Sequence, residues 1–92
     1  MKRVLTIAGS DCSGGAGIQA DIKTISAHGM YAMSVIVSVV AENTVHVLKK
    51  QDIAPEIVRA QVDAIYEDIG TDAVKIGMLP TPEVMSAVAE KL

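Results

Sequence analysis

Short apolar runs alternate with longer amphipathic segments along the chain. Apolar, partly β-branched runs predict strands buried on both faces, at residues 4–8, 33–41 and 72–77. After each of them, apolar residues recur at helical spacing, which predicts helices over residues 18–28, 55–69 and 82–92. Val45 to Lys50 indicates a short additional strand. The pattern is that of an α/β protein in which three strands alternate with three helices.

Local signals mark where the expected helices begin and end. Gly29 and Gly70 follow the first two helical patterns, and glycine readily takes the left-handed conformation found just after a helix. Pro55 falls in the first turn of the second helix. Thr81-Pro82-Glu83 combines a capping hydroxyl, a first-turn proline and a first-turn acid at the start of the third.

The alternation of strands and helices predicts right-handed crossovers and a mainly parallel, doubly wound sheet. Three strands and three helices cannot cover both faces of strands as apolar as these. We therefore expect residues 1–92 to form the first half of a doubly wound domain. Ligands of such sheets bind outside the carboxyl ends of the strands. Polar or glycine-containing clusters fall at all three of these ends, at residues 9–17, 42–44 and 77–78.

The segment 9–17 holds four glycines in nine residues, which favours close approach of a ligand to the backbone. It has the glycine spacing of a P-loop but lacks the lysine that would hold nucleotide phosphates, so we exclude that motif. Gly15, Gly17 and Ala20 match a dinucleotide fingerprint, with Glu42 as the ribose-binding acid. That alternative stays open, although roughly six residues separate the fingerprint from the predicted strand.

Composition and charge narrow the classes of partner. The chain has 92 residues, a net charge of −3, no Phe or Trp, and a single cysteine. Charges of both signs are mixed, so we expect neither nucleic acid nor a membrane surface as partner. One cysteine makes no internal disulfide, and no apolar run is long enough for a signal peptide or a membrane helix. We expect a cytoplasmic protein.

Few side chains stand out individually. Asp11 either faces a ligand or forms a local turn that holds the glycine segment. Asp21, considered alone, is typical of a solvated helix acid. Met78 suits either a core or a pocket wall. The remaining candidates lack metal-ligand spacing, and we interpret them as surface or incidental residues without a metal site: Cys12, His28 and His46.

Longer stretches resemble the hydroxymethylpyrimidine/phosphomethylpyrimidine kinases of thiamine biosynthesis, members of the ribokinase-like superfamily. The first stretch is Leu5-Thr6-Ile7-Ala8-Gly9-Ser10-Asp11. It continues as Ser13-Gly14-Gly15-Ala16-Gly17-Ile18-Gln19-Ala20-Asp21-Ile22-Lys23-Thr24. Three further matches are Met33-Ser34-Val35-Ile36, Asn43-Thr44 and Lys75-Ile76-Gly77-Met78-Leu79. The resemblance covers nearly the whole chain.

The resemblance implies phosphorylation of 4-amino-5-hydroxymethyl-2-methylpyrimidine and then of its monophosphate, with ATP and Mg²⁺. In that family the positions of Gly9, Asp21, Glu42 and Met78 line the pyrimidine pocket, and Asp11 shapes the loop beside it. The resemblance also implies that the ATP site and the catalytic aspartate lie in the second half of the fold. We therefore expect no catalytic or metal-binding residue within residues 1–92, and no kinase activity from this chain alone.

Two other functions stay open beside this one. The first is a pyridoxine- or pyridoxal-type kinase of the same fold, against which Asn43-Thr44 argues. The second is a non-catalytic remnant that binds a small heterocycle or only oligomerises. A half-sheet with an exposed apolar edge favours self-association, so we expect a homo-oligomer in either case.

Glu42 departs from the resemblance, because the family usually carries glutamine at this position. Glutamine offers one donor and one acceptor to the amino group and ring nitrogen of an aminopyrimidine, whereas a carboxylate offers only acceptors. Our hypothesis is that Glu42 still accepts from the amino group while a ring nitrogen carries the proton.

Overall fold

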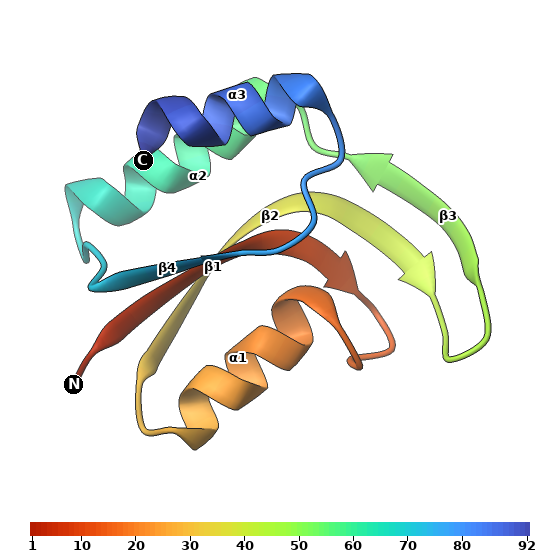
Figure 1. The fold of residues 1–92 in the computed structure, drawn as a ribbon, viewed down its shortest axis with the longest axis horizontal. Coiled ribbons are helices and arrows are strands. Elements are labelled where there is room, and N and C mark those ends of the chain that lie inside the picture. The colour runs from red at the N-terminus through yellow and green to blue at the C-terminus, as the bar shows by residue number, and fades with distance from the viewer.

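The computed structural model describes residues 1–92, arranged as one four-stranded sheet with three helices (Figure 1). The elements, in chain order, are β1 (Arg3–Asp11), α1 (Gly17–Ala27), β2 (Tyr31–Glu42), β3 (Val47–Asp52), α2 (Pro55–Glu67), β4 (Ala73–Ile76) and α3 (Pro82–Lys91). The order of strands in the sheet is β3-β2-β1-β4. The predicted α/β class is confirmed.

β1 lies between β2 and β4 and runs parallel to both. The helix α1 lies on one side of the sheet, and α2 and α3 lie together on the other (Figure 1). Successive crossovers therefore use opposite faces, as a doubly wound arrangement requires. The carboxyl ends of β1, β2 and β4 consequently meet at one edge of the molecule.

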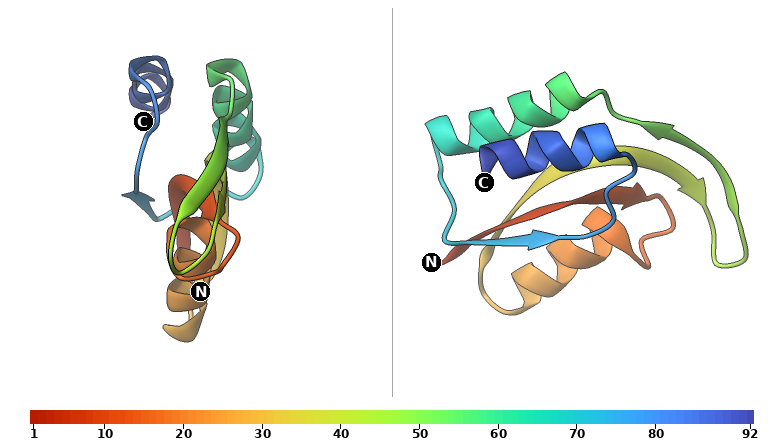
Figure 2. Two further views of the ribbon diagram at one scale, coloured as in Figure 1. Left: turned by 90° about the vertical axis from the view of Figure 1, so that its right-hand side faces the viewer. Right: turned by 45° about the horizontal axis from the view of Figure 1, so that its top comes forward.

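The sheet is mixed because β3 pairs antiparallel with β2. The sequence pattern predicted an extra strand at residues 45–50, and the structure places it slightly later, at Val47–Asp52. The turn before it is built by Asn43, whose Oδ1 accepts the backbone N–H groups of Val45 and His46 at 2.8 and 3.0 Å. The β2–β3 ribbon extends beyond the helices (Figure 2).

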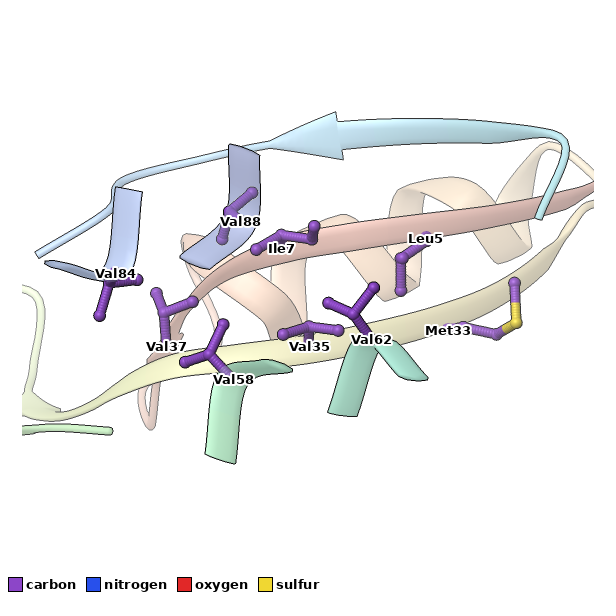
Figure 3. Packing of buried hydrophobic residues seen from close by; sticks show 9 residues of the cluster. All are labelled: Leu5, Ile7, Met33, Val35, Val37, Val58, Val62, Val84 and Val88. Carbon is purple, nitrogen blue, oxygen red and sulfur yellow. The ribbon is translucent and has the colours of Figure 1, made fainter. Parts of the chain in front are cut away.

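The main core lies between the sheet and the α2–α3 pair. Its nine buried side chains point toward one another between these elements (Figure 3): Leu5, Ile7, Met33, Val35, Val37, Val58, Val62, Val84 and Val88. All are aliphatic, as a chain without Phe or Trp requires. Burial of such side chains supplies most of the favourable free energy of folding.

Two residues predicted on apolar helix stripes are exposed. Ile57 is 52 % exposed, because it lies about 100° around the helix from Val58, which faces the sheet. Leu92 is 56 % exposed and follows the last residue of α3. The stripe of α2 is instead made by Val58 and Val62, with Ile65 and Ile69 partly buried beside them.

The residues predicted to mark the helix boundaries take the expected conformations. Gly29 and Gly70 have φ values of 74° and 70°, so both take the left-handed conformation. Thr81 Oγ1 accepts the N–H of Val84 at 3.1 Å and caps α3. The helix α2 ends at Glu67, two residues before the end of its apolar pattern.

Side chains contact both of the strands that flank β1. Gln61 of α2 accepts the backbone N–H of Ile36 and donates to its carbonyl, both at 2.9 Å, on the stretch of β2 that precedes its pairing with β3. At the start of β4, the guanidinium of Arg3 bonds both carboxylate oxygens of Asp72, at 3.1 and 3.0 Å. This side-chain hydrogen bonding from Arg3 holds the pKa of Asp72 far below its usual range.

The strand β4 is less buried than its apolar pattern predicted. Ile76 is 45 % exposed, because β4 has a neighbouring strand on one side only. None of the three helices is long and apolar enough to cross a membrane.

Candidate functional site

A cavity of about 190 Å³ opens where the carboxyl ends of β1, β2 and β4 meet. All three predicted clusters contribute to its lining: Ala8, Gly9, Ser10, Asp11, Ala16, Gly17, Val40, Glu42, Lys75, Gly77 and Met78. Four of the five predicted site residues are among them, and Asp21 is not. The volume lies below the roughly 300–1,000 Å³ of pockets for drug-sized ligands, which favours one small ring over a dinucleotide.

The glycine segment is shorter than predicted because β1 continues to Asp11, leaving residues 12–16 as the loop. Asp11 is 5 % exposed and holds this loop. Its Oδ1 accepts the N–H and Oγ–H of Ser13 at 2.9 and 2.6 Å, and its Oδ2 accepts the N–H of Gly15 at 3.0 Å. The Ser13 side chain is the main cause of a lowered pKa at Asp11. The turn-forming role is confirmed, and a contact of Asp11 with substrate stays a prediction.

Gly17 is the position of the loop that most strictly requires glycine. Its φ is 58°, and a Cβ there would lie 2.2 Å from the carbonyl oxygen of Gly9. Gln19 reinforces this contact, since its Oε1 accepts the N–H of Asp11 and its Nε2 donates to Ser10 Oγ, both at 2.8 Å. The start of α1 is thereby held in contact with the end of β1.

Cys12 joins the loop to the end of β2. Its Sγ–H donates to the carbonyl of Glu42 at 3.0 Å, and the N–H of Glu42 approaches the same sulfur at 3.4 Å. This contact has no local sequence signal, and it corrects the interpretation of Cys12 as an incidental residue. His28 and His46 are exposed, as predicted.

Glu42 lies half-buried at the end of β2, on the side of the cavity opposite β4. Partial burial, followed by the nearby negative charge of Asp11, raises the pKa of Glu42. Both effects favour the protonated acid, which can donate a hydrogen bond as a glutamine does. Met78 forms another wall, with its Cε 3.7 Å from where a Cβ of Gly9 would lie.

Asp21 lies on α1 outside the lining of the cavity, and its carboxylate is engaged within the protein. Its Oδ2 accepts Thr6 Oγ1 at 2.6 Å and pairs with Lys75 Nζ at 2.9 Å. Burial alone would raise the pKa of Asp21, yet the hydrogen bonds from Thr6 and Lys75 lower it. A direct substrate contact of Asp21 stays a prediction. Sequence reasoning missed Lys75 as a lining residue, although its place opposite Thr6 follows from the strand pairing.

Comparison with known proteins identifies the family. The sequence model described as phosphomethylpyrimidine kinase matches residues 11–92. The chain belongs to this family. It is 53 % identical over 94 residues to the hydroxymethylpyrimidine/phosphomethylpyrimidine kinase of Escherichia coli, covering 100 % of this chain and 35 % of that protein. The chain thus spans about a third of the length of this relative.

Solved structures of the same fold agree with the architecture. The phosphomethylpyrimidine kinase of Clostridium difficile superposes with a TM-score of 0.97 at 51 % identity, covering 100 % of this chain and 40 % of that one. A pyridoxal kinase from Staphylococcus aureus, in complex with AMP-PCP and pyridoxal, gives 0.87 at 36 % identity, covering 99 % and 34 %. The predicted ribokinase-like fold is confirmed, and family membership replaces the dinucleotide-binding alternative.

No group of three or more His, Cys, Asp or Glu side chains is arranged to hold a metal ion. The cavity carries the carboxyl groups of Asp11 and Glu42 together with the ammonium group of Lys75.

Replacing Gly17 with alanine tests how the loop is held. We expect Gly17→Ala to lower the free energy of unfolding by more than about 2 kcal/mol, because strain at positive φ adds to a backbone clash. Gly29→Ala is the matched control, since Gly29 also has positive φ but no atom within 4 Å of an added Cβ. Urea unfolding measures both variants, and equal losses would show that the contact with Gly9 does not matter.

Proposed function

We propose that this chain forms the substrate-binding part of a kinase that phosphorylates 4-amino-5-hydroxymethyl-2-methylpyrimidine and its monophosphate. The observation that carries the proposal is the small cavity at the strand ends, with the Glu42 carboxyl group at one side and Met78 as an apolar wall. Membership of the phosphomethylpyrimidine kinase family supports the same substrate.

The roles of the site residues follow from their positions. Gly9 and the loop held by Asp11 bring backbone atoms to the cavity lining, so a flat ring can approach the backbone. Met78 packs against the ring face, and Glu42 meets the amino group. ATP and Mg²⁺ belong to the proposed activity, and the residues that would hold them lie outside residues 1–92. The AMP-PCP in the complex of the S. aureus pyridoxal kinase supports nucleotide use.

Binding of the pyrimidine to the isotope-labelled chain tests the proposal. We expect the backbone amide NMR signals of Gly9 and Gly77 to shift on titration with the hydroxymethylpyrimidine, because both line the cavity. Pyridoxal should bind more weakly than the hydroxymethylpyrimidine by roughly tenfold at least, since its ring presents different polar groups. The spectrum also reports whether the chain is folded. A folded chain that prefers pyridoxal would move the function to the pyridoxal kinases, and one that binds neither would contradict the proposal.

The raised pKa of Glu42 predicts how substrate affinity depends on pH. Because the folded pKa is raised, Glu42 keeps its proton above the usual range of a glutamate and loses it as pH rises further. At that higher pH the complex loses the one proton that Glu42 shares with a ring nitrogen of the substrate. Substrate affinity should then fall by at most about tenfold per pH unit. Glu42→Gln carries its own N–H donor, and its affinity should be nearly independent of pH. Calorimetric titrations between about pH 5 and 8 compare the two. Parallel profiles would contradict the shared proton.

Self-association is also part of the proposal, because the free edge of β4 carries Ile76 at 45 % exposure. Sedimentation velocity at several concentrations should show a dimer or larger species. Ile76→Lys should weaken it, whereas Leu48→Lys, on the exposed β2–β3 ribbon, is the matched control. A monomer at all concentrations would contradict self-association, and a loss caused only by Leu48→Lys would contradict the β4 edge.

A further inference from the structure

Lys75 is the only cationic side chain that lines the cavity. It lies on β4 opposite Thr6 of β1, so it faces the same side of the sheet as α1. Its Nζ bonds Asp21 Oδ2 at 2.9 Å. The cavity therefore has an ammonium group on the β4 side, the Asp11 carboxyl group at the end of β1 and the Glu42 carboxyl group on the β2 side.

The Lys75 ammonium is held in place from two directions. Asp21 cannot turn away from it freely, because Thr6 Oγ1 donates to the same oxygen at 2.6 Å and Thr6 is fully buried. Gly77 lies on the other side, where a Cβ would be 3.3 Å from Lys75 Nζ. The absence of a side chain at residue 77 thus leaves the ammonium open toward the cavity.

The bond to Asp21 uses one of the three N–H donors of the ammonium. The others have no partner within the protein, so they are free to meet an acceptor atom in the cavity. The adjacent Asp21 carboxylate balances the charge, which suits a neutral acceptor better than a second anion.

Glu42 and Lys75 line the same cavity from the strands on either side of β1. Lys75 lies opposite Thr6, whereas Glu42 lies beyond Val40, the partner of Asp11, so the two side chains reach the cavity from different levels along β1. If Glu42 takes the amino group and the neighbouring ring nitrogen, the second ring nitrogen points toward β4.

We propose that Lys75, positioned by Asp21, donates a hydrogen bond to the ring nitrogen para to the amino-bearing carbon, and so selects a pyrimidine over a pyridine. This inference rests on the proposed substrate class, and it deepens it by assigning the second ring nitrogen. A pyridine has a single ring nitrogen and leaves either the Glu42 side or the Lys75 side without its partner, which is costly for a desolvated polar group.

Selectivity between two ligands tests the inference. The first ligand is the aminopyrimidine, and the second is its analogue with CH in place of the nitrogen para to the amino-bearing carbon. The unaltered chain should bind the aminopyrimidine about tenfold more tightly or better, the usual effect of one charge-assisted hydrogen bond. In Lys75→Met the ratio of the two affinities should fall to about one. Comparing ratios cancels differences in basicity between the ligands and in stability between the variants.

Lys91→Met is the matched control, because Lys91 forms an ion pair with Asp63 at 3.0 Å away from the cavity. It should leave the ratio unchanged. If the folded, unaltered chain binds no aminopyrimidine, the proposed function fails. If it binds but Lys75→Met keeps its selectivity, only the present inference fails.

Asp21→Asn distinguishes a positioning role from a direct one. If Asp21 acts through Lys75, Asp21→Asn should lower the selectivity ratio of the otherwise unaltered chain severalfold. In the Lys75→Met background the same substitution should have no further effect on that ratio. Equal effects in both backgrounds would mean that Asp21 acts on the second nitrogen without Lys75, which would overturn the inference. NMR titration gives both affinities and the folded state of each variant.

Discussion

Parallel pairing of β1 with β2 on one side and β4 on the other is the constraint on which the cavity depends. Parallel strands end at the same edge, so three segments far apart in the chain bring their carboxyl ends together. β1 can occupy this central place because its side chains are buried on both faces, with Leu5 and Ile7 toward α2 and α3 and Thr6 toward α1. Every polar group of the site is held relative to this strand.

Both backbone and side-chain contacts position the loop after β1. Asp11 supplies acceptors to the loop N–H groups, while Gly17 permits α1 to begin in contact with the end of β1. Cys12 then ties the same loop to β2. The result is a cavity lined by backbone and small residues and bordered by a few polar side chains.

The features that can be predicted from the sequence are those that depend on local sequence patterns. Apolar runs located β1 and β2, and Gly29, Gly70 and Thr81 located helix boundaries, because each reports the conformation of its own segment. The convergence of Gly9, Glu42 and Met78 followed from strand order alone. The bounds of β3 were less accurate, since all its residues are exposed and give no alternating pattern. The pairing of Asp21 with Lys75, 54 residues apart, depends on tertiary placement and had no local signal.

Gln61 limits the edges at which further strands can pair with the sheet. Its amide occupies the peptide groups of Ile36 as a neighbouring strand would, so that stretch of β2 is closed to further pairing. Next to it, β3 forms the outer edge and carries Lys49 and Lys50, and lysine on an edge strand opposes the approach of another strand. The opposite edge strand, β4, also carries a lysine, Lys75, but its ammonium group pairs with Asp21 of α1. A parallel strand added beyond β4 would place its carboxyl end beside Lys75 and Met78 and enlarge the same cavity from that side.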